Sequence, residues 1–339
     1  MGTIISRRTL LAGSAILAGG FAASRPVFGQ DGKFTMKCGA NAPEQTPHVV
    51  RLRAAFAAIK EETGGQLDIQ MFPASQLGSD NDMFLQVRSG AIDLMLNAGT
   101  NMSTLAPKAS IAAVAFAFKD YDTVWAAMDG ELGAQIRQEV NSIGLVCLPK
   151  AFDVGFRQIT NSVRPIQSPA DMKGLKIRSP QSDIYFSMFR GLGAAPVAKT
   201  FSEVYQSLQT KLLDGQENSL ALIQITKMYE VQKYISMTNH GWEYQWMIAN
   251  QKKWGALPEK LRIIAETHID RAAVLQREDW AGLMSKADGF LKEKAMVFNT
   301  PDRAAFKEAL VKSGYYAEWQ KKFGADAWAT LERYSGKLG

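Results

Sequence analysis

Apolar and polar positions alternate in short runs that are separated by stretches with helical spacing. Residues 33–39 and 67–72 have the two-residue period of strands, and residues 92–96 form an uninterrupted apolar run typical of a buried strand. Between these runs, residues 47–62 and 80–89 carry apolar side chains at helical spacing and are followed by glycine. This alternation predicts a mostly parallel sheet covered by helices.

The same alternation continues in the second half of the chain. We expect helices over residues 122–140, 183–191 and 220–233, a strand at 144–149 and another helix that starts at Ser202. Because the pattern restarts after about residue 152, a second α/β domain explains it better than one larger sheet.

A long helix is indicated near the C-terminal end. Residues 258–294 contain no internal proline, and their apolar side chains recur at helical spacing. About 35 helical residues would span about 50 Å, which is longer than one domain needs. The residues alone leave open whether this is one helix or two helices broken near Gly282 or Gly289.

The N-terminus has the layout of an export signal. Ser6-Arg7-Arg8 precedes an uncharged apolar run that ends near Ala23 and is too short for a stable membrane anchor. The paired arginines are typical of a twin-arginine signal, although the general secretory route stays open. We therefore expect residues 1–29 to be cleaved near Gly29 and the protein to reach the periplasm.

Net charge narrows the choice of partners. The 339 residues carry a formal charge of +6, which falls to +3 after export because residues 1–29 hold three arginines and no acid. This weakly basic balance, without a long Lys/Arg run, does not indicate nucleic-acid binding but suits an anionic solute. The length suggests two domains with separate cores.

Cysteines and histidines indicate neither a metal nor a cofactor. Cys38 and Cys147 each lie in an apolar, strand-like run, so we expect buried free thiols, with a disulfide as the alternative in an oxidising compartment. His48, His240 and His268 have no metal-ligand spacing. No Gly-x-Ser-x-Gly, His-Glu-x-x-His or phosphate-loop motif occurs, so no enzymatic activity is predicted.

Two arginines are the candidates for binding an anion. Leu175 to Arg178 alternates apolar and cationic residues, and Pro180 follows, which places Arg178 at the carboxyl end of a short strand. Ligand crevices in open α/β sheets lie at this end. Arg157 stands in a second such run. Judged by spacing alone, both arginines are more simply explained as surface salt-bridge partners.

Four ordered motifs change that judgement. Residues 156–161 (FRQITN), 171–180 (DMKGLKIRSP), 201–205 (FSEVY) and 214–218 (DGQEN) closely resemble the solute-binding proteins of tripartite ATP-independent periplasmic (TRAP) transporters. The resemblance extends from about residue 33 to the C-terminus. It implies a periplasmic protein that performs no chemistry, binds a small carboxylate and delivers it to the permease subunits of the transporter.

The resemblance also implies the ligand-binding residues. In this family the arginine at the position of Arg178 clamps the ligand carboxylate, and the residues matching Arg157 and Asn218 accompany it. Further contacts are implied at Phe201 and Asn41. The planar guanidinium of Arg178 would hold the carboxylate through two parallel hydrogen bonds.

The identity of the acid is a weaker inference. The family also places a contact around Gln245, and we add the neighbouring Trp242 and, less strongly, Trp246 as aromatic walls. Relatives that bind sialic acid carry a glutamate where this chain has Ala98, so sialate is not expected. An aromatic pocket with two cations favours an aromatic or 2-oxo acid, and a sugar acid (uronate or aldonate) is the alternative.

The implied architecture is α/β, the two-domain periplasmic binding protein fold, with a hinge and one long helix spanning both domains. We expect domain I to comprise residues 31–153 plus about 244–283, and domain II about 154–243 plus 284–339. We expect a monomer. A receptor that presents its ligand to a membrane sensor would have the same fold, and an enzyme of similar architecture is the more distant alternative.

Overall fold

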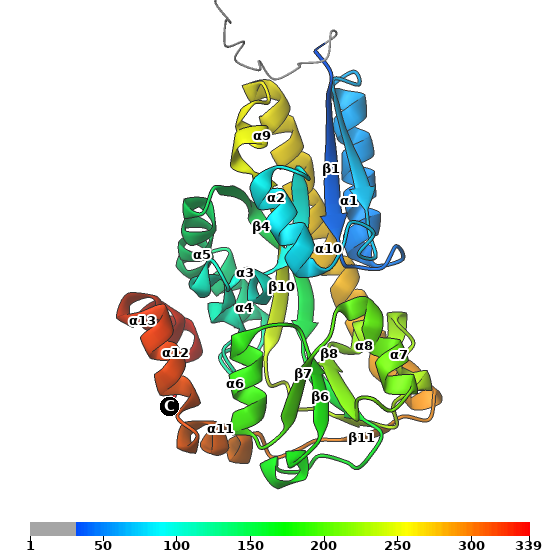
Figure 1. The fold of residues 1–339 in the computed structure, drawn as a ribbon, viewed down its shortest axis with the longest axis vertical. Helices are drawn as coiled ribbons and strands as arrows, with labels where there is room; N and C mark the ends of the chain where they lie inside the picture. Colours follow the sequence, from blue (N-terminus) through cyan, green and yellow to red (C-terminus); the bar gives the residue numbers. More distant parts are fainter. Residues whose placement is uncertain (1–31) are drawn as a thin grey trace, which may run out of the picture.

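The computed structural model describes residues 32–339, which form two α/β units with a long helix running behind them (Figure 1). The predicted export signal lies outside the described residues. The first unit contains a five-stranded sheet in the order β2-β1-β3-β10-β4, in which β10 runs antiparallel to both of its neighbours. Its strands are β1 (Phe34–Ala40), β2 (Leu67–Phe72), β3 (Leu94–Ala98), β4 (Leu145–Phe156) and β10 (Trp242–Asn250).

The second unit contains a six-stranded sheet in the order β11-β9-β5-β8-β6-β7. β6 is parallel to both β7 and β8, whereas β5 is antiparallel to β8 and β9. The strands are β5 (Gln158–Asn161), β6 (Lys176–Ser179), β7 (Ala195–Ala198), β8 (Gly215–Asn218), β9 (Tyr234–Ser236) and β11 (Val297–Asn299).

The predicted helices are mostly present, and two of them are shorter than expected. The expected helix 122–140 is divided into two at Gly130, where any Cβ would come within 2.4 Å of the Ala126 carbonyl oxygen. The expected helix 220–233 ends early because Lys227 adopts a left-handed conformation. The helices of the two units are α1 (Pro47–Glu62), α2 (Asp80–Ser89), α3 (Gly99–Met102), α4 (Tyr121–Met128), α5 (Glu131–Ser142), α6 (Asp183–Gly191), α7 (Val204–Gln209), α8 (Leu220–Ile225) and α9 (Gln251–Gly255), with 3-10 turns η1 (Pro107–Ala113), η2 (Pro169–Met172), η3 (Phe201–Glu203) and η4 (Met228–Glu230).

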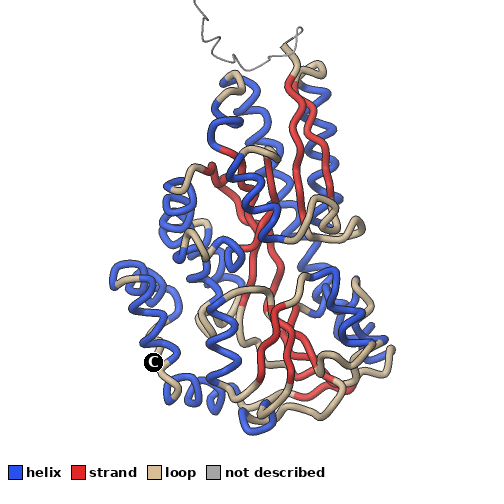
Figure 2. The backbone as a smooth tube through the Cα atoms, viewed as in Figure 1, coloured by secondary structure: helices blue, strands red, loops and turns tan. Residues whose placement is uncertain are grey.

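The long helix α10 (Glu259–Glu293) is continuous over 35 residues, as predicted. It packs against α1 and β4 of the first unit and against α8 of the second, so it braces both (Figure 2). Neither Gly282 nor Gly289 interrupts it, because a glycine inside a helix costs only about 1 kcal/mol relative to alanine. The two-domain fold with a spanning helix is therefore confirmed.

The C-terminal helices contact both units. α11 (Arg303–Lys312) and α12 (Tyr315–Phe323) pack on α6, whereas α13 (Ala325–Ser335) packs against α4 and α5. The hydroxyl of Tyr315 also accepts a 3.1 Å hydrogen bond from the Ala115 amide of the first unit. The sequence predicts that residues 284–339 belong to domain II. The apolar faces of α12 and α13 join a hydrophobic cluster that contains residues of both units.

The two units are joined through a very short connection. β4 ends at Phe156 and β5 begins at Gln158, so Arg157 alone separates strands that belong to different sheets. The return segment passes alongside, since the Arg157 amide donates to the Gly241 carbonyl over 2.8 Å. Cys38 in β1 and Cys147 in β4 are free and buried, as expected.

Gln276 attaches α10 to the strand that leads into this connection. Its side chain is fully buried, accepts from the Asp153 amide at 2.8 Å and donates to the Asp153 carbonyl at 2.9 Å. An apolar side chain at this position would leave both backbone groups without partners. Each unsatisfied buried group costs about 1–3 kcal/mol.

We therefore predict that Gln276→Leu lowers the free energy of unfolding by about 2–4 kcal/mol, measured by urea denaturation. The control is Glu278→Leu on the exposed side of the same helix, which should change stability by less than about 0.5 kcal/mol. Equal effects of the two substitutions would refute a specific role for the Gln276 contacts.

Candidate functional site

A cavity lies between the two units, at the carboxyl ends of β1, β3, β6 and β8. It encloses about 570 Å³, including its opening to solvent. This is the edge at which α/β sheets place their ligands. The lining combines charged, amide, hydroxyl and apolar side chains: Asn41, Ala42, Pro43, Thr46, His48, Asp80, Ala98, Thr100, Asn101, Val154, Arg157, Arg178, Pro180, Phe201, Asn218, Leu222, Glu243 and Gln245.

Arg178 lies near the end of β6 and is 3% exposed. Its Nε and Nη2 donate to the Lys199 carbonyl at 2.9 and 2.7 Å, and its guanidinium lies 5.8 Å from the centre of the Phe201 ring. Within residues 32–339 no salt bridge joins Arg178 to an acid. Burial therefore dominates and lowers the pKa of Arg178 to about 10. A buried cation without a paired anion is costly, so the site favours an anionic ligand.

Arg157 is different because it already has a counterion. Its Nε and Nη2 form a bidentate ion pair with Glu217, and Nη2 lies 3.0 Å from the Asn218 side-chain oxygen. Burial acts to lower the pKa of Arg157, but Glu217 outweighs it and raises that pKa above its usual value. Burial likewise acts to raise the pKa of Glu217, yet Arg157 and His240 hold it below the usual range. The extra positive charge expected of Arg157 is therefore neutralised within the protein.

A chain of amide contacts in the first unit ends at Asp80, whose charge acts on Arg178. Gln245 Nε2 donates to Asn41 Oδ1 at 3.0 Å, and Asn41 Nδ2 donates to Asp80 Oδ2 at 3.1 Å. The other oxygen, Asp80 Oδ1, is buried without a hydrogen-bond partner among the described residues. Burial raises the pKa of Asp80, while Asn41 and Arg178 oppose this. Asp80 Oδ1 is thus an acceptor available to a ligand.

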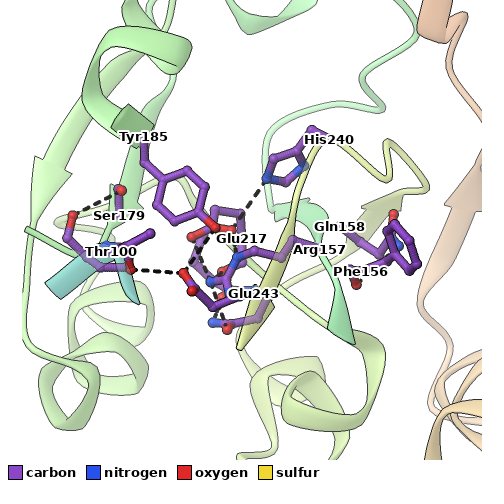
Figure 3. A network of polar contacts seen from close by, with 12 residues as sticks. Thr100, Phe156, Arg157, Gln158, Ser179, Tyr185, Glu217, His240 and Glu243 are labelled. Atoms are coloured by element: carbon purple, nitrogen blue, oxygen red, sulfur yellow. Dashed lines mark hydrogen bonds and ion pairs between the residues drawn. The ribbon is translucent and has the colours of Figure 1, made fainter. Parts of the chain in front are cut away.

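Glu243 is an acid on the connecting strand β10 (Figure 3). Its Oε2 accepts from the hydroxyls of Thr100 at 2.9 Å and Tyr185 at 3.1 Å, and Oε1 accepts from the Tyr244 amide at 3.2 Å. Thr100 belongs to the first unit and Tyr185 to the second, so Glu243 joins both. Burial is the largest influence and raises the pKa of Glu243 to about 7.

These features match a known protein family. A family model described as bacterial extracellular solute-binding protein, family 7, matches residues 38–322. The chain belongs to this family. It is a TRAP transporter solute-binding protein, and this family works in the periplasm.

Individual relatives cover most of the chain. The 2,3-diketo-L-gulonate-binding periplasmic protein YiaO of Escherichia coli is 32% identical over 253 residues, 74% of this chain and 77% of YiaO. A TRAP periplasmic solute-binding protein of Roseobacter denitrificans with bound β-D-glucuronate has a TM-score of 0.85 and 26% identity, covering 90% of this chain and 100% of that chain. Another from that organism, with bound L-galactonate, has a TM-score of 0.82 and 29% identity over 88% and 98% of the two chains.

Trp242 and Trp246, which were expected as aromatic walls of this solute-binding protein, do not line the cavity. Trp242 is 1% exposed, donates its indole N–H to Asp153 at 2.9 Å and stacks on Tyr244 with ring centres 5.5 Å apart. Successive side chains of a strand face opposite sides, so Glu243 and Gln245 reach the cavity while Trp242 and Trp246 enter the core. The side chain of Trp242 therefore lies on the core face of β10, where it does not form a wall of the cavity.

Sequence reasoning missed the three acids Asp80, Glu217 and Glu243. Asp80 was noted only as the start of a helix, and Glu217 only as part of a family motif. The one signal for Glu243 was a single acid in a strand otherwise made of aromatic, apolar and amide residues. Within residues 32–339, no group of three metal-ligating side chains is present, and no helix is long and apolar enough to cross a membrane.

Removing the acid of the buried Arg157–Glu217 pair should destabilise the protein. Glu217→Gln leaves Arg157 buried without its counterion and should lower the free energy of unfolding at pH 7 by about 3–5 kcal/mol. Because the pKa of Glu217 is held below its usual 4.5, the difference from wild type should be complete above about pH 4.5 and shrink as the pH falls further.

Chemical denaturation between pH 3 and 7 measures this difference. The control is Glu308→Gln, which removes an exposed partner of Lys312 and should cost less than about 1 kcal/mol. A Glu217→Gln protein as stable as wild type at pH 7 would show that the ion pair does not stabilise the connection between the units.

Proposed function

We propose that this protein binds a small organic acid through a carboxylate held by Arg178 and delivers it unchanged to the membrane permease of a TRAP transporter. The observation that carries the proposal is the contrast between the two arginines. Arg157 is neutralised by Glu217, whereas Arg178 is equally buried and has no salt-bridged acid among the described residues. A ligand carboxylate would provide the missing anion.

The donors of Arg178 suit this role. A guanidinium has five N–H groups, and the hydrogen bonds to Lys199 use the one on Nε and one on Nη2. Nη1 and the second hydrogen of Nη2 are left to hold a carboxylate through two parallel bonds. Asn218 and the ring of Phe201 line the same cavity and would contact the adjoining part of the ligand.

A sugar acid suits the rest of the cavity better than an aromatic acid. The aromatic interpretation rested on an aromatic pocket with two cations, but of Phe201, Trp242 and Trp246 only Phe201 lines the cavity, and Arg157 is paired with Glu217. The cavity instead presents the polar side chains of Asn41, Asp80, Asn101 and Gln245, which can pair with ligand hydroxyls. Similar proteins with bound glucuronate, galacturonate and L-galactonate support this choice. We therefore propose a uronate or aldonate as the ligand.

Closure of the two units would bury this ligand. In the adjoining opening, which shares Asp80 and Arg178 with the cavity, Asn81 of the first unit donates to Gln181 of the second over 2.9 Å. The chain passes between the units through two short connections and α10, and the C-terminal helices contact both units. Short connections of this kind are where hinge motion occurs in binding proteins that close around a ligand. Burial strengthens the hydrogen bonds to the carboxylate because it removes competing water.

Arg178→Ala should weaken binding of the sugar acid by about 30-fold to several thousand-fold, since truncating one partner of a buried charged pair costs about 2–5 kcal/mol. Arg178→Lys keeps the charge but loses the paired geometry, so it should still bind at least about tenfold more weakly than wild type. Calorimetric titration with D-glucuronate, D-galacturonate and L-galactonate measures both variants.

The matched control is Arg190→Ala, which removes an exposed arginine on α6 of the same unit and should leave affinity unchanged. Melting curves of all variants establish that they are folded. Wild-type affinity in a folded Arg178→Ala protein would exclude Arg178 as the carboxylate-binding residue.

A further inference from the structure

The cavity contains an acid that the carboxylate-binding role does not use. Glu243 lines the cavity and is 3% exposed. No arginine or lysine of the described residues forms a salt bridge with it, and its three hydrogen-bond donors are the Thr100 and Tyr185 hydroxyls and the Tyr244 amide. A buried carboxyl group with neutral partners at a ligand site is a marker of function.

Glu243 and Arg178 line the cavity with different neighbours. Among the described residues, Arg178 contacts the Lys199 carbonyl and the Phe201 ring, whereas Glu243 contacts Thr100, Tyr185 and Tyr244. Arg178 also lines the adjoining opening together with Lys199, and Glu243 does not. A ligand whose carboxylate is held by Arg178 would extend its other end toward Glu243.

We propose that Glu243 determines specificity by accepting a hydrogen bond from a hydroxyl at the far end of the acid and by excluding ligands with a second carboxylate there. This inference depends on the proposed binding of a carboxylate at Arg178. An ionised Glu243 would strengthen a hydroxyl contact, because charge-assisted hydrogen bonds are about twice as strong as neutral ones. A second carboxylate would meet a like charge in a buried site, which rejects wrong ligands.

Protonation offers an independent way to vary this charge. Burial raises the pKa of Glu243 to about 7, and Glu217 adds to this, while Arg157, Thr100 and the Tyr244 amide oppose it. The remaining group that faces it is the Tyr185 hydroxyl, whose own pKa lies far above neutral. Glu243 is thus mostly ionised at pH 8 and mostly neutral at pH 6, so exclusion of a second carboxylate should be strong at pH 8 and weak at pH 6.

The test uses pairs of acids that differ only in the terminal group. D-Gluconate and D-glucarate form one pair, and D-galactonate and D-galactarate another, each comparing a terminal hydroxyl with a terminal carboxylate. At pH 8 the wild-type protein should bind the aldonate at least about tenfold more tightly than the aldarate. Glu243→Gln keeps an acceptor for Thr100 and Tyr185 and should reduce this ratio to within about threefold.

Two controls separate this role from a general charge effect. Lowering the pH from 8 to 6 should increase aldarate affinity in the wild-type protein but not in Glu243→Gln. Asp80→Asn removes an acid near Arg178 and should not relax the discrimination as Glu243→Gln does. Melting curves establish that both variants are folded.

The outcomes distinguish this inference from the proposed function. If an aldonate binds in an Arg178-dependent manner but wild type accepts the matching aldarate equally well, the role of Glu243 is wrong and acid binding at Arg178 stands. The role is also wrong if Asp80→Asn and Glu243→Gln relax discrimination equally. If no sugar acid binds the wild-type protein, the proposed function fails and this inference fails with it.

Discussion

The buried ion pair between Arg157 and Glu217 is the interaction on which the connection between the two units depends. Arg157 is the single residue between β4 of one sheet and β5 of the other, and Glu217 comes from β8 of the second sheet. His240, on the returning connection, places its Nε2 3.4 Å from the same carboxylate. Removing either partner of this buried pair would leave the other charge uncompensated at a cost of about 3–5 kcal/mol, so the pair stabilises the arrangement of both crossing segments.

The same pairing explains why two similar arginines have different roles. Both stand in short strand motifs of alternating character, and both are 3% exposed. Arg157 is paired with an acid 60 positions later in the chain, whereas Arg178, among residues 32–339, has only the neutral Lys199 carbonyl at hydrogen-bonding distance. The difference therefore lies in tertiary packing, which spacing along the sequence does not reveal.

Local signals predicted most of the fold, and a family resemblance supplied most of the candidate site. Periodicity was sufficient for β1 and β2. For α10 it indicated helix but left one or two helices open, and the family resemblance favoured the single helix that the structure has. Periodicity failed where the backbone breaks, at Gly130 and Lys227, and where α12 and α13 pack on a distant unit. The sequence near β10 also does not reveal which side of the strand faces the cavity. A shift of the strand by one residue would exchange the environments of Trp242 and Glu243.

The acids that sequence reasoning missed give the cavity its charge balance. With every group ionised, Arg157 and Arg178 contribute two positive charges and Asp80, Glu217 and Glu243 contribute three negative ones. His48 and His240 add no charge at neutral pH, because burial lowers the pKa of each.

An anion would then enter a site of net charge −1, which is unfavourable in a buried environment. Burial raises the pKa of Glu243 to about 7, so its negative charge is partly lost near neutral pH. The protein thus keeps acids that can accept hydrogen bonds from a polyhydroxylated ligand and still leaves Arg178 free to attract its carboxylate.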